Sequence, residues 1–213
     1  MNQRFVGAPV TTDLQDQFGE IDVYLFDQFL RGRICPGMRL LDAGCGGGRN
    51  LVYALRAGYD VFGCDADAAA IDAVRRLVAR LAPHLPPDNL RVEPVERMSF
   101  PDGHADIVLA SAVLHFAADD RQFRAMVNEC WRVLRPGGLL FTRLASSIGS
   151  EALVQQIAGR RFRLPDGSDR YLVDEALLED VTTALGGTLV DPLKTTVVQN
   201  QRSMTTWVIR KPA

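Results

Sequence analysis

The sequence predicts an α/β protein with a doubly wound, mostly parallel, seven-stranded sheet and a C-terminal antiparallel strand pair. Short apolar runs alternate with longer segments of helical periodicity, and a glycine-rich loop follows the first apolar run. After position 187 the chain becomes rich in β-branched residues, which are typical of strands. Short buried strands separated by amphipathic helices form right-handed crossover units, and these units build a parallel sheet.

The first two thirds of the chain supply five strands and three helices of this fold. The strands are expected at Met38–Asp42, Asp60–Cys64, Leu90–Pro94, Ala105–Ala110 and Leu139–Leu144. The helices between them are expected at Asn50–Ala57, Ala66–Leu81 and Asp119–Leu134. In the second helix, apolar residues recur at helical spacing, arginines occupy the other side, and prolines follow the end.

The two ends of the chain carry the remaining expected elements. Leu14–Leu30 precedes the first strand and has aromatic and apolar residues at mostly helical spacing. After the fifth strand, we expect a short helix at Ala152–Ile157 and a longer helix at Val173–Leu185. Two long strands, Thr188–Val198 and Ser203–Arg210, are joined by a short link, which makes them antiparallel.

Composition and charge argue against several classes of function. Of the 213 residues, 47% are hydrophobic and 23% are charged, and the net charge is −2, so we expect a buried core and no nucleic-acid partner. No apolar run approaches the roughly 20 residues that cross a membrane, and Met1–Thr12 does not resemble a secretory signal. The four cysteines form no CxxC pair, so we expect reduced thiols, no metal site and a cytoplasmic location.

The most informative segment is Leu40–Asn50, a strand that runs through a glycine loop into a helix. Its sequence is LLDAGCGGGRN, and its glycines allow a ligand to lie directly on the backbone. The ligand is expected at the carboxyl ends of the strands, where the strand order reverses. Dinucleotide-binding proteins use G-x-G-x-x-G, but Arg49 stands at the third glycine position, which counts against the alternative of an NAD-dependent oxidoreductase.

With Asp42 before the glycines, this segment resembles motif I of the S-adenosylmethionine-dependent methyltransferases with the Rossmann-like fold. The resemblance implies that Asp42 supports the loop and the amino-acid end of S-adenosylmethionine, and that S-adenosylhomocysteine is the product. The residues of this segment that the resemblance assigns to the cofactor are Asp42, Gly44, Cys45, Gly46, Gly48 and Asn50. Gly44–Asn50 also looks like the G-C-G-x-G-R-N form of tellurite-resistance methyltransferases, which suggests a soft chalcogen or thiol acceptor as one option.

Further segments resemble the same family in the same order along the chain. Asp65 ends the second strand, where the family has an acid that accepts hydrogen bonds from the ribose hydroxyls, and Ala66 follows it. Ser111 ends the fourth strand, and Trp131–Leu140 matches the helix, turn and fifth strand. The resemblance implies that Asp65, Ala66 and Ser111 contact the cofactor.

The loop after the third strand departs from the family pattern. Pro94 stands where the family usually has an aspartate, and Ser99 replaces a proline. Glu96 is expected to substitute for the missing acid beside the adenine, with Arg97 and Met98 lining the ring. This departure keeps open a second alternative, a non-catalytic relative that binds the cofactor or a partner protein without transferring a methyl group.

The acceptor is expected to be a small molecule that is methylated by in-line displacement. Such a transfer mainly requires that the reacting atoms are aligned and that water is excluded. His115 follows the fourth strand and could act as a base, pack against the cofactor or cap a helix. Tyr24 and Tyr171 are the other candidate catalytic residues, and Arg160–Arg163 is either a solvated face or a contact for an anionic substrate.

These elements suggest one domain over residues 1–213. Within it we expect a helical lid at 1–35, a cofactor-binding core at 36–145 and a substrate-side insertion at 146–172. The C-terminal helix and antiparallel strands occupy 173–213. The sequence leaves open the oligomeric state, the methylated atom and whether the lid closes over a ligand.

Overall fold

The computed structural model describes residues 14–213, so the stretch considered above for a secretory signal lies outside the described residues. One large sheet organises the described chain, with strand order β10-β11-β5-β4-β1-β2-β3. Its strands are β1 (Arg39–Ala43), β2 (Asp60–Asp65), β3 (Leu90–Val92), β4 (Ala105–Ser111), β5 (Leu134–Ser146), β10 (Lys194–Val198) and β11 (Arg202–Arg210). The two-residue strand β9 (Thr188–Leu189) also pairs with β11.

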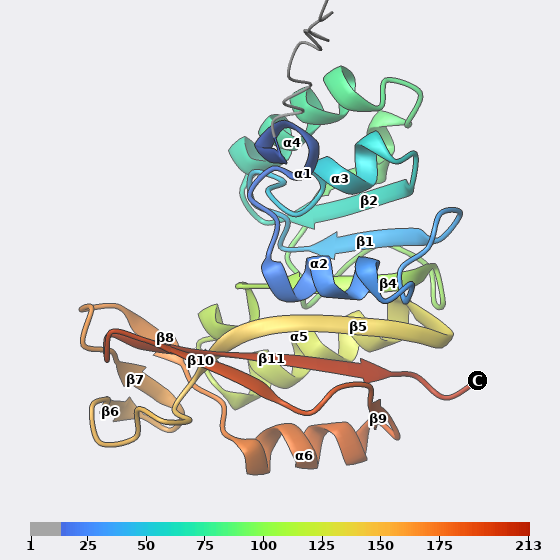
Figure 1. The fold of residues 1–213 in the computed structure, drawn as a ribbon. Helices are drawn as coiled ribbons and strands as arrows, with labels where there is room; N and C mark the ends of the chain where they lie inside the picture. Colours follow the sequence, from blue (N-terminus) through green and yellow to red (C-terminus); the bar gives the residue numbers. More distant parts are fainter. Residues whose placement is uncertain (1–13) are drawn as a thin grey trace, which may run out of the picture.

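The large sheet is mostly parallel, and its strand order reverses beside β1. Strand β1 pairs in parallel with β2 on one side and with β4 on the other. Strand β11 runs antiparallel to both β5 and β10, so the doubly wound sheet and its C-terminal antiparallel pair are confirmed. The arrows of β1 and β2 point to the left in Figure 1, and a ligand of such a sheet is expected at that edge.

Helices cover both faces of this sheet. On one face lie α2 (Val23–Leu30), α3 (Val52–Arg56) and α4 (Ala68–Leu81); on the other lie α5 (Asp120–Val133) and α6 (Glu175–Ala184). Adjacent strand residues point to opposite faces, so Leu40 enters the core beneath the first set of helices and Leu41 enters the core beneath the second. Within residues 14–213, no helix is long and apolar enough to cross a membrane.

The expected single helix over Leu14–Leu30 is two helices. The first, α1 (Leu14–Phe18), ends at Gly19, whose φ of +62° terminates a right-handed helix. Asp22 then begins α2, because its carboxylate accepts hydrogen bonds from the backbone N–H groups of Tyr24 and Leu25. The break is a local effect of one glycine and one capping carboxylate that overrides the apolar periodicity.

The prediction of a short helix at Ala152–Ile157 is wrong. The chain there enters β6 (Gln155–Ala158), which joins β7 (Arg161–Arg163) and β8 (Asp169–Tyr171) in a separate antiparallel sheet of order β6-β7-β8. A helix of so few residues gains little from its own hydrogen bonds, whereas Gly159 permits the turn, at φ +53°, that pairs β6 with β7. Figure 1 shows this small sheet beyond the carboxyl ends of the large sheet's parallel strands.

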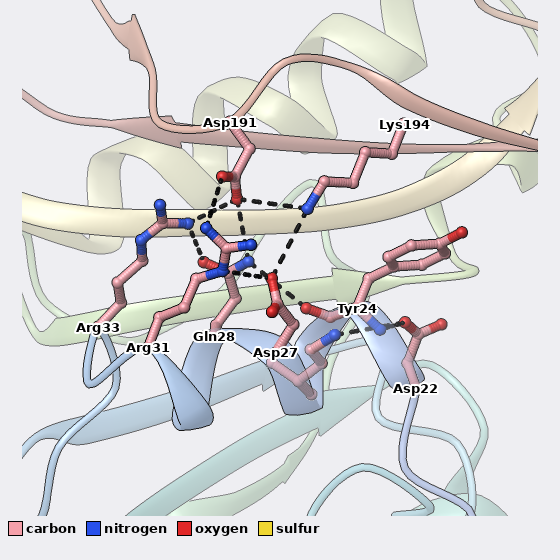
Figure 2. A network of polar contacts seen from close by, with 9 residues as sticks. Asp22, Tyr24, Asp27, Gln28, Arg31, Arg33, Asp191 and Lys194 are labelled. Atoms are coloured by element: carbon pink, nitrogen blue, oxygen red, sulfur yellow. Dashed lines mark hydrogen bonds and ion pairs between the residues drawn. The ribbon is translucent and has the colours of Figure 1, made fainter.

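The long strand expected at Thr188–Val198 is interrupted before β10. Pro192 has no N–H to donate to a ladder, so β9 and β10 are separate strands. The link between them carries Asp191 over α2, as Figure 2 shows. Asp191 accepts hydrogen bonds from Gln28 Nε2 at 3.1 Å and from Arg33 Nη1 at 2.6 Å. These buried polar contacts fasten the N-terminal helical segment to the C-terminal segment.

Candidate functional site

The glycine loop after β1 forms the floor of the candidate site. Gly44, Gly46 and Gly48 all have positive φ, at +74°, +50° and +78°. The backbone N–H groups of Gly44 and Cys45 both donate to the carbonyl oxygen of Cys64, which holds the loop against β2. A Cβ built at Gly46 or Gly47 would meet no heavy atom within 4 Å, so this part of the backbone is open to a ligand.

Asp42 lies at the end of β1 with a carboxylate that has no partner. The residue is 1% exposed, and neither carboxylate oxygen has a hydrogen-bond partner among residues 14–213. Burial raises the pKa of Asp42 to about 7, against the opposing effect of the Arg49 charge, while Asp65 adds a smaller raising effect. An unsatisfied buried carboxylate is costly, so a cationic or N–H donating group fits this position.

Asp65 lies across the loop from Asp42, at the end of β2. One carboxylate oxygen accepts a hydrogen bond from Gly46 N and the other from Asp67 N, both at 2.9 Å. Each oxygen of a carboxylate has further lone pairs, so Asp65 can still accept from two hydroxyls. Ala66 is exposed beside it, and Asp67 caps α4 by accepting from Ala69 N.

The loop after β3 is held mainly by its own contacts with α5. Glu96 accepts a hydrogen bond from Gln122 Nε2 at 2.9 Å, so its carboxylate is engaged with α5. Met98 is buried, and its backbone N–H donates to Glu129. Arg97 is exposed. The structure therefore uses Glu96 to fix this loop, which leaves the adenine contacts expected for these three residues as a proposal.

Asn50 and Ser111 frame the site. The buried Asn50 Oδ1 accepts a hydrogen bond from Asp22 N at 3.0 Å, so this side chain ties the start of α2 to the glycine loop. Ser111 Oγ accepts a hydrogen bond from Arg49 Nη2 at 3.1 Å. Both side chains were expected to bind the cofactor, and in the structure both have protein partners that hold the site together.

A cavity of about 400 Å³ opens at the carboxyl ends of β4 and β5. The small sheet and the start of β11 close its other side, and Ala112 and His115 lie on its wall. Ala112 adopts a φ of +63°, and its N–H donates to Arg143 O at 2.7 Å. A non-glycine residue at positive φ is strained, and such strain clusters at functional sites. The volume suits a small molecule.

His115 is held in one tautomer on the wall of this cavity. Its Nδ1 accepts a hydrogen bond from Ala145 N at 3.2 Å, so the proton of the neutral ring is on Nε2. Burial, with a smaller contribution from the Arg170 charge, lowers the pKa of His115 to about 4. In this state the ring presents an N–H donor at Nε2, and its role as a general base stays a prediction.

The two tyrosines expected at the site do not line the cavity. Tyr171 is fully buried, stacks on Phe123 at 4.7 Å between ring centroids, and donates a hydrogen bond to Asp120 at 3.0 Å. The Tyr24 hydroxyl shares a 2.8 Å hydrogen bond with Thr196 and so links α2 to β10. Both hydroxyls have hydrogen-bond partners within the protein, and a catalytic role for either tyrosine stays a prediction.

The structure brings to the cavity residues that the sequence reasoning missed. Arg143, Arg170 and Arg202 lie on its wall, and no local pattern connects them. Asp22, fully buried at its side chain, pairs with Arg143 at 2.8 Å. Asp22 could have been found, because an aspartate directly before an apolar helical stretch is a capping signal.

Known proteins resemble this chain over most of its length. A family model described as a methyltransferase domain matches residues 41–142. The ubiquinone biosynthesis O-methyltransferase of Chelativorans sp. (strain BNC1) is 31% identical over 169 residues, which are 77% of this chain and 63% of that protein. The malonyl-acyl-carrier-protein O-methyltransferase of Serratia marcescens is 33% identical over 129 residues, which are 59% of this chain and 47% of that protein. The chain thus spans less than two thirds of the length of these relatives.

Solved structures share the fold at lower identity. The crystal structure of the Burkholderia thailandensis 1,6-didemethyltoxoflavin-N1-methyltransferase contains 1,6-didemethyltoxoflavin and S-adenosylhomocysteine; it superposes with a TM-score of 0.70 at 18% identity. The match covers 94% of this chain and 82% of that one. A methyltransferase from Methanosarcina mazei matches with a TM-score of 0.64 at 21% identity. The family model includes the glycine loop, and it decides against the nicotinamide alternative. Residues 41–142 match a methyltransferase domain, and the chain is similar to S-adenosylmethionine-dependent methyltransferases with the Rossmann-like fold.

Proposed function

We propose that this protein transfers a methyl group from S-adenosylmethionine to a small-molecule acceptor. The observation that carries the proposal is the partnerless, buried carboxylate of Asp42, which lies beneath an open glycine loop at the edge where the strand order reverses. The family has this cofactor, and its amino group is the kind of cationic donor that such a carboxylate lacks. The cavity beside His115 provides space for an acceptor next to that loop.

Three parts of the chain would hold the cofactor. Asp42 would accept from its amino group, Asp65 from its ribose hydroxyls, and the open backbone at Gly46–Gly47 would lie against it. When bound, S-adenosylmethionine supplies a methyl carbon that is activated by the positively charged sulfur. The chain contributes by orienting the acceptor and by keeping water away from the reacting atoms.

His115 is the residue of this chain that we propose to orient the acceptor. Its Nε2–H is available on the cavity wall, since Nδ1 is occupied by the Ala145 N–H. A neutral donor at this place can hold an oxygen lone pair and fix the direction of attack. The relatives above are named as O-methyltransferases, which favours oxygen as the methylated atom. The similarity of Gly44–Asn50 to tellurite-resistance methyltransferases suggests a thiol or chalcogen acceptor instead, and that acceptor stays a prediction.

Calorimetric titration with S-adenosylhomocysteine, with NAD as control, tests this proposal first. We expect micromolar-range binding of S-adenosylhomocysteine and no binding of NAD. A panel of small alcohols, acids, phenols and thiols with S-adenosylmethionine then tests turnover. Binding without turnover across the panel would favour the non-catalytic relative instead, and no binding of either ligand would refute the proposed function.

The substitution Asp65→Asn is expected to weaken binding of S-adenosylhomocysteine roughly tenfold to a hundredfold. The reason is the loss of charge-assisted hydrogen bonds from the ribose hydroxyls, worth about 1–3 kcal/mol. Asp72→Asn is the matched control, because the side chain of Asp72 on α4 is exposed and pairs only with Arg75 among the described residues. Equal affinity of both variants, with unchanged melting temperature, would rule out the ribose contact.

A further inference from the structure

Four guanidinium groups line the cavity beside His115. They come from four separate parts of the chain: Arg49 follows the glycine loop, Arg143 lies on β5, Arg170 on β8 and Arg202 at the start of β11. Among residues 14–213, Asp166 is the single acidic residue on the cavity wall. The whole chain has a net charge of −2, so this concentration of positive charge is local.

Most of this charge is not neutralised by the protein. Arg143 pairs with Asp22, but its Nε is buried without a partner among the described residues. Within the described part of the chain, Arg49 donates only to the Ser111 hydroxyl and to the backbone carbonyl of Glu20. On the cavity wall the four arginines thus outnumber the one carboxylate, Asp166, and Asp22 forms an ion pair with Arg143 alone.

Arg170 and Arg202 both lie on the cavity wall. Arg170 donates to the backbone carbonyl of Asp169 and lies over the Phe116 ring at 4.7 Å. Within residues 14–213, no carboxylate oxygen lies within 4.0 Å of a guanidinium nitrogen of Arg170 or Arg202. Both charges act on Asp166, whose pKa is lowered chiefly by the hydrogen bond from Ser168, so Asp166 is ionised at neutral pH.

The basic cluster Arg160–Arg163, which the sequence suggested as a possible anion contact, differs from the cavity arginines because two of its members form ion pairs within the chain. Arg160 pairs with Asp174 at 2.9 Å, and Arg163 pairs with Asp169. These arginines already have carboxylate partners within the chain, so they do not require an outside anion. Arg170 and Arg202 lie on the cavity wall without a carboxylate partner among the described residues, whereas the three arginines of the basic cluster lie off that wall.

The cofactor itself brings one carboxylate to this region, in its amino-acid part. Arg49 follows the glycine loop directly and contributes an opposing charge at Asp42, so it is the arginine placed to take that carboxylate. Arg170 lies on the small sheet and Arg202 on β11, so neither belongs to the glycine loop. Their charges remain for the second molecule in the cavity.

We propose that the methyl acceptor is a small organic anion whose carboxylate or phosphate is held by Arg170 and Arg202. The proposal rests on the proposed function, because it assigns this cavity to the acceptor. Guanidinium groups bind both kinds of oxyanion through paired N–H donors, and a half-buried cavity strengthens the interaction. The body of the acceptor lies against the apolar wall formed by Phe116, Leu164 and Met204.

Binding of simple anions to the protein saturated with S-adenosylhomocysteine tests the proposal. The probes are benzoate and phenyl phosphate, with benzamide as an uncharged molecule of similar shape, each at millimolar concentration and followed by ligand-observed NMR. We expect at least one anion to bind and benzamide not to bind. Benzoate alone would identify a carboxylate site, and phenyl phosphate alone a phosphate site. Equal binding of all three, or of none, would overturn the proposal.

Arginine variants then locate the anion. Arg170→Gln and Arg202→Gln are expected to weaken binding of the anion roughly tenfold to a hundredfold each, from loss of charged hydrogen bonds. Arg163→Gln is the matched control: it removes the same charge from the same small sheet outside the cavity wall. Anion binding that responds equally to all three variants would contradict the assignment.

The affinity for S-adenosylhomocysteine separates this inference from the proposed function. All three variants should bind it as the parent protein does, because none of them lies at the glycine loop. If the parent binds S-adenosylhomocysteine but no anion, the acceptor class is wrong and the proposed function stands. If the parent binds no S-adenosylhomocysteine, the proposed function fails. Anion binding measured in the absence of S-adenosylhomocysteine still tests whether Arg170 and Arg202 hold an anion.

Discussion

Gly44→Ala is expected to destabilise the protein by about 2–5 kcal/mol. Gly44 has a φ of +74°, which costs an alanine about 1–2 kcal/mol. A Cβ at this position would lie 2.3 Å from Val113 Cγ2, and the resulting overpacking costs about 1–3 kcal/mol more. Urea unfolding measures the sum of these effects.

Gly47→Ala is the matched control for this prediction. Gly47 lies in the same loop, does not have positive φ, and a Cβ there would meet nothing within 4 Å. A Gly44→Ala/Val113→Ala double variant removes the overlap with the Cγ atoms but keeps the 2.7 Å contact with the Cβ of residue 113 and the backbone strain, so it should recover only part of the lost stability. If Gly44→Ala unfolds at the same urea concentration as Gly47→Ala, the loop is not constrained in the way described.

Asp42→Asn is expected to stabilise the folded chain above pH 7. The pKa of Asp42 is about 7 in the folded protein and 3.8 in the unfolded chain, so between these values the folded state binds more protons. Stability therefore falls as pH rises from 3.8 to 7 and stays reduced above it. The cost at pH 8 is on the order of 4 kcal/mol, and the asparagine variant avoids it. Urea unfolding of both proteins at pH 5 and pH 8 measures the difference.

The same substitution is expected to weaken binding of S-adenosylhomocysteine at least roughly tenfold, because the amino group of the ligand loses its carboxylate partner. Pairing with that amino group favours ionised Asp42, so binding to the parent at pH 7 should release about half a proton. Titrations in phosphate and Tris, which differ in ionisation enthalpy, measure this release. Asp72→Asn should release the same amount as the parent. Identical enthalpies for the parent in both buffers would contradict ionisation of Asp42 on binding.

The large sheet could be predicted from the sequence because its signals are local. Leu40 and Leu41 are both buried, one on each face, and continuous apolar runs are typical of strands covered on both sides. The relation between Asp42 and Asp65 could also be predicted, since β1 and β2 are neighbours with Asp42 opposite Gly63. The carboxylates of both residues therefore lie at the same edge of the sheet, with the glycine loop between them.

Side-chain partners within the site could not be predicted in this way. Asn50 and Ser111 are expected from the sequence to contact the cofactor, whereas in the structure their polar atoms bind Asp22 N and the Arg49 guanidinium. The state of His115 depends on a backbone N–H that lies 30 residues further along the chain. Composition and periodicity describe each segment by itself, and they carry no information about which distant group will satisfy a given polar atom.

By itself, the sequence determined the doubly wound sheet, the glycine loop and its two carboxylates, because short-range patterns specify each of these. Only the tertiary structure decided which side chains face the cavity. Arg170 and Tyr171 are neighbours on β8, and alternation along a strand sends them to opposite faces. Arg170 consequently lines the cavity and Tyr171 enters the core. That choice depends on the packing of the small sheet against α5 and β11, through contacts that lie far apart in the sequence.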